Sequence, residues 1–207
     1  MKLLRVGKFG KEKPAVLDKN GKIRDLSKHL DDFNPSTLNF STLEKIKKIN
    51  LETLPEISSS TRVGSCIAKP GKFLAIGLNY SDHAAETNAK IPKEPIIFNK
   101  AANCMIGPND NIILPKFSKK LDWEVEIAFV IGKSTKYISE EDSPNHILGY
   151  CIVNDISERE WQKERGGTWD KGKSGDTFGP TGPYLVTKDE LENVQNLSMS
   201  LDIDGKR

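Results

Sequence analysis

Two glutamates, Glu124 and Glu126, lie two residues apart in an apolar segment at residues 123–130. Because strand side chains alternate between faces, both carboxylates would project from one face, opposite the large apolar side chains. A strand with a wet outer face is the ordinary interpretation of this pattern. Here the glutamate face continues with Ala128 and Val130, which indicates partial burial. Two buried carboxylates repel each other and favour a bound cation that neutralises them.

A third carboxylate, Asp155, follows the apolar run at residues 150–153, which predicts a strand buried on both faces. An Asp at this place could cap the next helix. However, Ser157 and Glu160 already have the spacing of a capping box, which leaves Asp155 available as a ligand. Two Glu and one Asp suit Mg²⁺ or Mn²⁺ better than zinc. On spacing alone, a metal site and ordinary surface carboxylates both stay open.

A histidine and a glutamate three residues apart, His83 and Glu86, fall in a segment that predicts a short helix at residues 81–86. They would share one helix face. A carboxylate beside an imidazole fixes its tautomer and raises its basicity, as general-base catalysis requires. For two isolated residues, an ordinary surface pair is the better interpretation.

The stretch from Gly167 to Ser174 matches the literal pattern of a phosphate-binding loop, G-x-x-x-x-G-K-[ST]. That motif requires a buried strand before the loop and a helix after it. The preceding residues are charged, and the following ones are too rich in glycine and proline to begin a helix. We therefore disfavour a nucleotide site and interpret the stretch as an ordered loop that presents Lys173, with Asp176 as a second candidate, to a pocket.

Short strands are the elements that must position these residues, because short apolar runs alternate with turns. We expect a small N-terminal domain at residues 1–65 and a catalytic domain at 66–207. In the first, a helix would begin at Ser41, whose spacing to Glu44 is that of a capping box. In the second, a helical piece is expected at 156–165. The expected strands are at residues 2–7, 14–18, 73–77, 95–101, 111–115, 123–132, 150–153 and 182–186.

The composition is that of a soluble globular protein, with 36% hydrophobic and 29% charged residues among 207. A net charge of +2 gives no indication of a nucleic-acid or membrane partner. No apolar run approaches the roughly 20 residues that a membrane span needs, and the N-terminus does not look like a signal peptide. We therefore expect a cytoplasmic protein. Its three cysteines are too widely spaced for a zinc knuckle or a disulfide framework.

Five successive motifs resemble those of the fumarylacetoacetate hydrolase family: GLNYSDHAAE, PIIFNKA, LDWEVEIAFVIGK, GYCIVNDISERE and KGKSGDTFGPTGPYLV. The resemblance covers the chain from about Gly71 to its end, and the leading module is similar to that of many bacterial members. It implies an α+β, β-rich fold, a mixed-sheet β-roll, that pairs as a homodimer. It also implies Mg²⁺ or Mn²⁺ on Glu124, Glu126 and Asp155, a water-activating pair in His83 and Glu86, and a catalytic Lys173. Substrate contacts are expected from Asn79, Tyr80, Lys100, Gln162 and Asp176.

The activity implied by this resemblance is C–C cleavage in diketo acids, or decarboxylation or tautomerisation of 2-oxo acids. We therefore expect a divalent-metal-dependent hydrolase or lyase that acts on a small 2-oxo or 2,4-diketo acid through a metal-stabilised enolate. The most similar subgroups are described as ureidoglycolate lyase and as diketo-deoxy-sugar-acid hydrolase. The residues do not choose between these and an oxaloacetate decarboxylase or tautomerase.

The last residues depart from the family pattern, because members usually continue further. Asp204-Gly205 predicts a hairpin turn, and Arg207 follows before a returning strand could form. We expect a C-terminally truncated chain whose sheet lacks its last strands. An inactive binding or scaffold protein that keeps the front of the fold therefore stays open as an alternative.

Overall fold

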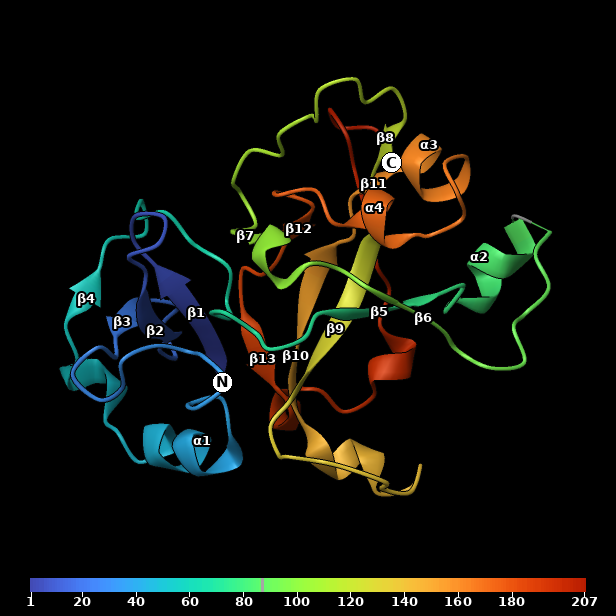
Figure 1. Cartoon of the computed structure of the whole chain (residues 1–207). Coiled ribbons are helices and arrows are strands. Elements are labelled where there is room, and N and C mark those ends of the chain that lie inside the picture. Colours follow the sequence, from blue (N-terminus) through green and yellow to red (C-terminus); the bar gives the residue numbers. More distant parts are fainter. Residues whose placement is uncertain (87) are drawn as a thin grey trace.

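The computed structural model describes residues 1–86 and 88–207, with the side chain of Glu86 outside the described set. Its largest element is a seven-stranded sheet in the order β4-β3-β2-β1-β13-β10-β9, which runs in Figure 1 from the left side of the molecule to its centre. Neighbouring strands in this sheet are antiparallel. The strands are β1 (Lys2–Val6), β2 (Lys13–Leu17), β3 (Ile23–Asp25), β4 (Glu56–Ile57), β9 (Val125–Ile131), β10 (Ile147–Asn154) and β13 (Leu185–Thr187).

The sheet passes across the predicted boundary between residues 65 and 66. Strand β1 pairs with β2 on one side and with β13 on the other, with Leu3 opposite Leu185. Buried side chains from both parts pack into a single cluster that includes Phe33, Leu148 and Cys151. The two parts therefore share a sheet and a core, and their division into two domains stays a prediction about organisation.

Helix α1 (Phe40–Lys47) confirms the helix predicted in the N-terminal part, but its cap differs from the predicted one. Asn39, not Ser41, is the N-cap, and its side-chain oxygen accepts a hydrogen bond of 2.9 Å from the amide of Thr42. The extended backbone of Asn39 places its carboxamide over the free amides of the first turn. One 3₁₀ turn, η1 (Leu51–Thr53), follows the helix.

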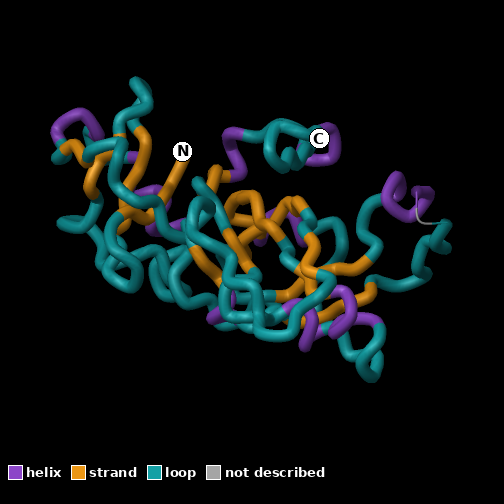
Figure 2. Tube along the Cα trace, turned by 90° about the horizontal axis from the view of Figure 1, so that it is seen from above, coloured by secondary structure: helices purple, strands orange, loops and turns teal. Residues whose placement is uncertain are grey.

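Smaller elements surround the sheet. Strands β5 (Leu74–Gly77) and β6 (Ile96–Asn99) form an arm that ends in α2 (Ser81–Glu86), and Figures 1 and 2 both show α2 projecting from the body. A parallel pair, β7 with β12, makes the strand set mixed. The other elements are β7 (Met105–Ile106), β8 (Leu121–Asp122), β11 (Ser157–Glu158), β12 (Gly179–Pro180), α3 (Arg159–Lys163), α4 (Asp170–Lys173), η2 (Ala102–Cys104), η3 (Ser143–His146), η4 (Lys188–Glu190) and η5 (Val194–Asn196).

Two predictions about local structure are wrong. Residues 111–115 form no strand, and they run as irregular chain with Ile113 and Leu114 exposed. The helix expected at residues 156–165 shrinks to α3, because Ser157 and Glu158 instead pair with β8. Both errors have the same cause, since an apolar run or a helical period does not say which partner strand is available.

The faces of β9 and β10 also differ from expectation. Strand β10 is not buried on both faces, because Ile152 is 54% exposed. On β9, the edge strand, the large residue Phe129 is 57% exposed. Ala128 and Val130 instead pack against the main core. The face that carries the glutamates is therefore the one that continues into the core, as the sequence predicted for that face.

The C-terminal residues form the predicted turn. Asp204 and Gly205 both have positive φ, of 50° and 76°. Ile203 and Lys206 exchange backbone hydrogen bonds of 2.8 and 2.9 Å across it. Such a turn matches the twist of hairpin strands. Among the described residues, no helix has both the length and the apolar character needed to cross a membrane.

Candidate active site

Strand pairing brings the three predicted carboxylates to one end of β9 and β10. Glu126 in β9 lies opposite Val153 in β10. Glu124 directly precedes β9 and Asp155 directly follows β10, and the amide of Asp155 donates a 2.8 Å hydrogen bond to the carbonyl of Glu124. These carboxylates, together with the cationic side chains that contact them, are called the carboxylate centre below.

Lys173 lies between two of these carboxylates. Its ammonium nitrogen is 2.5 Å from Glu124 Oε2 and 2.7 Å from Asp155 Oδ2, and only 2% of the residue is exposed. The glycine-rich stretch therefore does present Lys173 to the other predicted residues. Lys173 lies at the end of the four-residue helix α4, which falls within the motif and is followed by irregular chain. In a phosphate-binding loop the helix would instead begin directly after the loop.

Gly172 allows α4 to approach α3 closely enough to place Lys173. A Cβ atom at this position would lie 2.5 Å from the amide nitrogen of Gln162 and 2.6 Å from the carbonyl oxygen of Glu158. Real Cβ atoms do not come so close to backbone atoms, so the glycine is required by packing and not by its φ angle.

Glu126 is held by residues from the loop before α2. The amide of Asn79 donates to Glu126 Oε2 at 3.1 Å, and the hydroxyl of Tyr80 accepts from the amide of Ile127 at 3.3 Å. Burial raises the pKa of Glu126, and repulsion from Glu124 and Asp155 adds to the effect, while hydrogen bonds from Asn79 and Tyr80 oppose it. The three carboxylates therefore interact electrostatically.

Tyr80 also shows the low polarity of this region. Burial is the first cause that raises the pKa of the Tyr80 hydroxyl to about 12, and the charge of Glu126 adds to it. The hydroxyl is therefore protonated near neutral pH and can donate a hydrogen bond. Asn79 and Tyr80, both predicted to touch substrate, thus lie beside a predicted metal ligand.

Arg159 is a member of the carboxylate centre that the sequence did not reveal. Its guanidinium contacts Glu124 Oε1 at 2.6 Å and Asp122 Oδ2 at 2.7 Å, and it donates to Gln162 Oε1 at 3.1 Å. Partial burial alone would lower the pKa of Arg159, but Glu124 and Asp122 raise it overall. In the sequence, only its position four residues after Asp155 suggests that Arg159 belongs to the site.

The predicted capping box beside Asp155 is wrong. The N-cap of α3 is Glu158, whose carboxylate accepts from the amide of Trp161 at 3.0 Å. Ser157 instead donates its hydroxyl to the carbonyl of Asp155 at 3.0 Å. The carboxylate of Asp155 is nevertheless not used as a cap, because it faces Lys173 and Lys100.

The remaining predicted substrate contacts differ in exposure. Lys100 and Gln162 are each 2% exposed, and the Lys100 ammonium lies 2.6 Å from Asp155 Oδ1. Asp176 is exposed. Burial and the contact with Asp155 place Lys100 behind the carboxylates, so its predicted contact with substrate gains no support from its position.

The predicted pair of His83 and Glu86 lies on α2, which confirms the helix but not the pair. His83 is exposed, and its backbone amide donates a 2.8 Å hydrogen bond to the carboxylate of the neighbouring Asp82. The side chain of Glu86 lies outside the described residues. The dyad therefore stays a prediction.

The carboxylate centre has the donor chemistry of a divalent-cation site. Asp155 Oδ1 is buried and receives no directed hydrogen bond, although the Lys100 ammonium is only 2.6 Å away. In the described part of the chain, no three His, Cys, Asp or Glu side chains stand close enough to hold a metal ion as they are. The carboxylates are instead balanced by cationic side chains: Lys173 contacts Glu124 and Asp155, Arg159 contacts Glu124 and Lys100 contacts Asp155. The oxygen donors fit a hard cation, and binding one requires Lys173 to give up part of these contacts.

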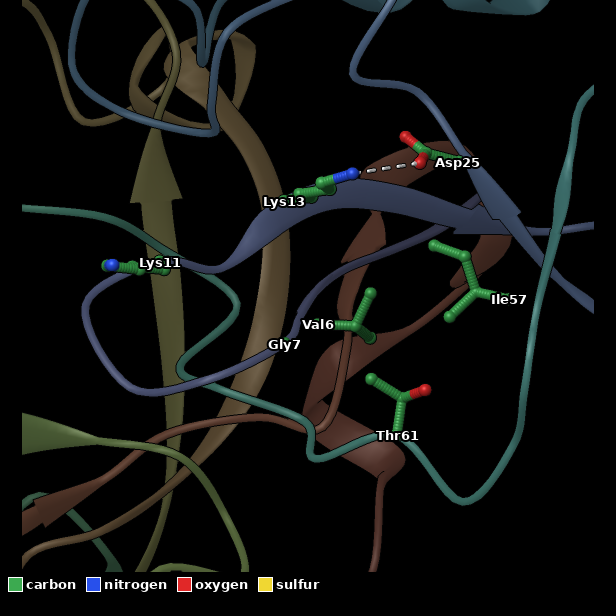
Figure 3. A pocket seen from close by; sticks show the side chains of 7 residues that line it. All are labelled: Val6, Gly7, Lys11, Lys13, Asp25, Ile57 and Thr61. Carbon is green, nitrogen blue, oxygen red and sulfur yellow. Dashed lines mark ion pairs between the residues drawn. The ribbon is translucent and has the colours of Figure 1, made fainter.

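A pocket of about 240 Å³ lies elsewhere, in the N-terminal part (Figure 3). Lys13 and Asp25 form an ion pair of 3.7 Å at its rim. No predicted site residue lines it. It is therefore separate from the carboxylate centre.

Comparison with known proteins decides the family. Residues 72–207 match the sequence profile described as "Fumarylacetoacetate (FAA) hydrolase C-terminal". The chain belongs to the fumarylacetoacetate hydrolase family. A Burkholderia ambifaria relative, provisionally named a hydrolase, is 52% identical over 207 residues, which are 100% of this chain and 73% of that relative.

Solved structures of the fumarylacetoacetate hydrolase family have the same fold. The fumarylacetoacetate hydrolase from psychrophilic Exiguobacterium antarcticum has a TM-score of 0.76 and 28% identity, over 93% of this chain and 68% of its own. Maleylpyruvate hydrolase from Sphingobium sp. SYK-6, in complex with manganese(II) ion and pyruvate, has a TM-score of 0.74 and 22% identity, over 93% of this chain and 69% of its own. At that identity it shows the fold alone.

Proposed function

We propose that the protein is a divalent-metal-dependent hydrolase or lyase that cleaves a C–C bond in a small 2-oxo or 2,4-diketo acid. The observation that carries the proposal is the buried Lys173, which lies between Glu124 and Asp155. The negative charges of these two carboxylates also act on nearby Glu126. Membership of an enzyme family and a relative that bears the name of a hydrolase support it.

The cation in this proposal is Mg²⁺ or Mn²⁺. When bound, it supplies a Lewis acid and a template for the oxygens of an oxo acid. Glu124, Glu126 and Asp155 would hold it through carboxylate oxygens. Asn79 and Tyr80 would fix Glu126 for this role by their hydrogen bonds to it.

Lys173 would stabilise the negative charge that develops on the substrate. Its ammonium is fixed by α4 but is shared between two carboxylates, so it can exchange one of them for an enolate oxygen at little cost in position. A preorganised cation in a region of low polarity is worth far more than one in water. Arg159 contacts Glu124 on its other carboxylate oxygen and would add positive charge near the substrate. Gln162 would hold Arg159 in place by accepting a hydrogen bond from it.

Water activation would fall to His83, oriented by Glu86. The support is their spacing on α2 and the position of this helix directly after Asn79 and Tyr80, which reach Glu126. His83 would take a proton from water, and the water would attack the distal carbonyl. Decarboxylation or tautomerisation would need the enolate stabilisation but not this step.

We further propose a cytoplasmic homodimer. Apolar side chains on the outer face of β9 and β10, Phe129, Ile131 and Ile152, are each at least half exposed, as contact surfaces between subunits often are. Sedimentation velocity tests this proposal, because a monomer at tens of micromolar would contradict it.

The proposed chemistry is tested by measuring Mn²⁺ binding and turnover together. Mn²⁺ is the first probe because a protein with this fold holds it. We expect Glu124→Ala to weaken Mn²⁺ binding by about 10- to 100-fold and to abolish metal-dependent cleavage of acylpyruvates or oxaloacetate. Glu164→Ala is the matched control, since Glu164 is a half-exposed ion-pair partner of Lys120. Equal binding by both variants and the wild type would refute the metal site.

A further inference from the structure

Lys100 is a buried cation to which the proposed reaction gives no task. It directly follows β6, and 2% of the residue is exposed. Its ammonium lies 2.6 Å from Asp155 Oδ1. It also donates to the carbonyl of Ile156, at 3.4 Å, and to the carbonyl of Lys173. One side chain therefore touches the Asp155 carboxylate, the main chain after it, and the main chain of Lys173.

The backbone on both sides of Lys100 is tied to helix α4. The amide of Asn99 donates to the carboxylate of Asp170 at 2.9 Å, at the start of α4. The amide of Ala101 donates to the hydroxyl of Ser174 at 2.9 Å, at its end. The position of the Lys100 ammonium is therefore coupled to the helix that carries Lys173.

Asp155 thus has two cations, one on each oxygen, and they differ in what else they do. Lys173 on Oδ2 also contacts Glu124, whose side chain is 24% exposed. Lys100 on Oδ1 is enclosed by protein carbonyls. If Lys173 turned to a ligand, Lys100 would still neutralise Asp155, and a buried carboxylate without a counter-ion is costly.

We propose that Lys100 is a positioning residue, the buried counter-ion that holds Asp155 in place while Lys173 engages the substrate. This inference rests on the proposed function of the carboxylate centre. It assigns Lys100 a role through Asp155 and α4 in place of direct contact with substrate. Lys100 and Lys173 then contact the same carboxylate, but Lys100 positions it and Lys173 engages the substrate.

The first test separates positioning from substrate binding. With Mn²⁺ and oxaloacetate or an acylpyruvate, we expect Lys100→Met to lower kcat by about 10- to 100-fold, as loss of groups behind metal ligands does. KM should change by less than about threefold, because Lys100 does not touch substrate. Lys100→Gln keeps a hydrogen-bond donor and should recover part of kcat. A large rise in KM with kcat unchanged would overturn the inference.

Lys13→Met is the matched control for these variants. Lys13 is an ion-paired lysine in the N-terminal part, 3.7 Å from Asp25 and with 61% of its side chain exposed. Its removal should leave kcat and KM unchanged within about twofold, since exposed pairs contribute little. A loss in this variant equal to that of Lys100→Met would mean a general effect of lost charge and would overturn the inference.

A second test does not depend on activity. In urea unfolding, the effect of Lys100→Met on the unfolding equilibrium constant should be at least about fivefold smaller in an Asp155→Asn background. Additive effects would contradict the pairing. If the wild type turns over no acid in the panel, the proposed function fails and this cycle alone decides the role of Lys100. If Lys100→Met does not fold, Lys100→Gln takes its place.

Discussion

Two networks of charged side chains in this molecule are built from different cations. In the N-terminal network, Arg62 forks onto Asp110 at 2.7 and 2.6 Å and reaches Glu12 at 2.8 Å. Arg5 forks onto Asp32 at 2.6 and 2.9 Å. Two parallel hydrogen bonds from a planar guanidinium fix both distance and orientation. This network therefore links segments that are far apart in the chain through hydrogen bonds of fixed orientation.

The carboxylate centre instead has lysines at its heart. Lys100 and Lys173 are compact charges on flexible stems, and they share Asp155. Its arginine, Arg159, stands at the side and is partly exposed. The difference is one of geometry: the guanidinium groups of the N-terminal network make paired hydrogen bonds, whereas each contact on Asp155 comes from a single ammonium group. We expect activity to depend on the ammonium contacts and stability to depend on the guanidinium pairs. Four changes test this distinction, from the largest expected effect to the smallest.

Lys173→Met should have the largest effect on activity. We expect turnover to fall by about 10²- to 10³-fold, because a preorganised charge is lost from where negative charge develops. Steady-state kinetics with Mn²⁺ and a 2-oxo acid measures it. Retention of more than a tenth of the activity would mean that Lys173 only balances charge. Lys171→Met, on the exposed part of the same helix, is the control.

Gly172→Ala should act on the same lysine without touching it. The added methyl group would meet the amide nitrogen of Gln162 at 2.5 Å, so α4 must shift. We expect the free energy of unfolding to fall by about 1–3 kcal/mol. Turnover should fall by up to about 10²-fold, because a small displacement of a catalytic group is costly. Unchanged kinetics would show that the position of α4 is not critical. Gly167→Ala serves as a comparison, since nothing lies within 4 Å of its Cβ position and its strain comes from φ alone.

Arg62→Met, in the N-terminal network, should lower stability and leave turnover almost unchanged. We expect the free energy of unfolding to fall by about 1–3 kcal/mol, because Glu12 and Asp110 both lose a charged donor. Turnover per folded molecule should stay within about twofold. Arg62→Lys should be intermediate, since it keeps the charge but loses the fork. Urea unfolding and kinetics on the same samples decide this, and lost activity at full stability would contradict it.

Asp110 gives the smallest effect, which depends on pH. Arg62 is the first cause that lowers the pKa of Asp110 below its ordinary value of 3.8. A lowered folded-state pKa stabilises the protein above the unfolded value, and this stabilisation is lost as pH falls through the folded value. The gap in thermal midpoint between wild type and Asp110→Asn should therefore be larger at pH 7 than at pH 3. A constant gap would contradict the ion pair.

Local patterns in the sequence predicted what depends on near neighbours. Short apolar runs bounded by turns predicted the strands at β1, β2, β9 and β10, and a helical piece was predicted at α2. Alternation predicted that Glu124 and Glu126 share a strand face, whereas the grouping of Asp155 with them was implied by the family resemblance. The order of motifs identified the family. The absence of a nucleotide site at the glycine-rich stretch stays a prediction, and the structure places α3 before it and irregular chain after it.

Contacts between distant segments could not be predicted in this way. Nothing in the sequence near Arg159 says that its guanidinium reaches Glu124, or that Lys100 sits behind Asp155. The caps at Asn39 and Glu158 replaced the expected ones because several polar residues near each helix start could serve. Packing decides between such alternatives, and packing depends on the whole chain.

The place of β13 between β1 and β10 has a consequence for how the chain is made. Lys2 pairs with Val186, and the carbonyl of Met1 accepts a 2.9 Å hydrogen bond from the amide of Thr187. Strand β1 therefore stays without this partner until β13, which lies far later in the sequence, has been synthesised. Such high contact order slows folding and leaves that edge open to chaperones during translation. We expect this protein to mature after synthesis of its sheet is complete and not in step with it.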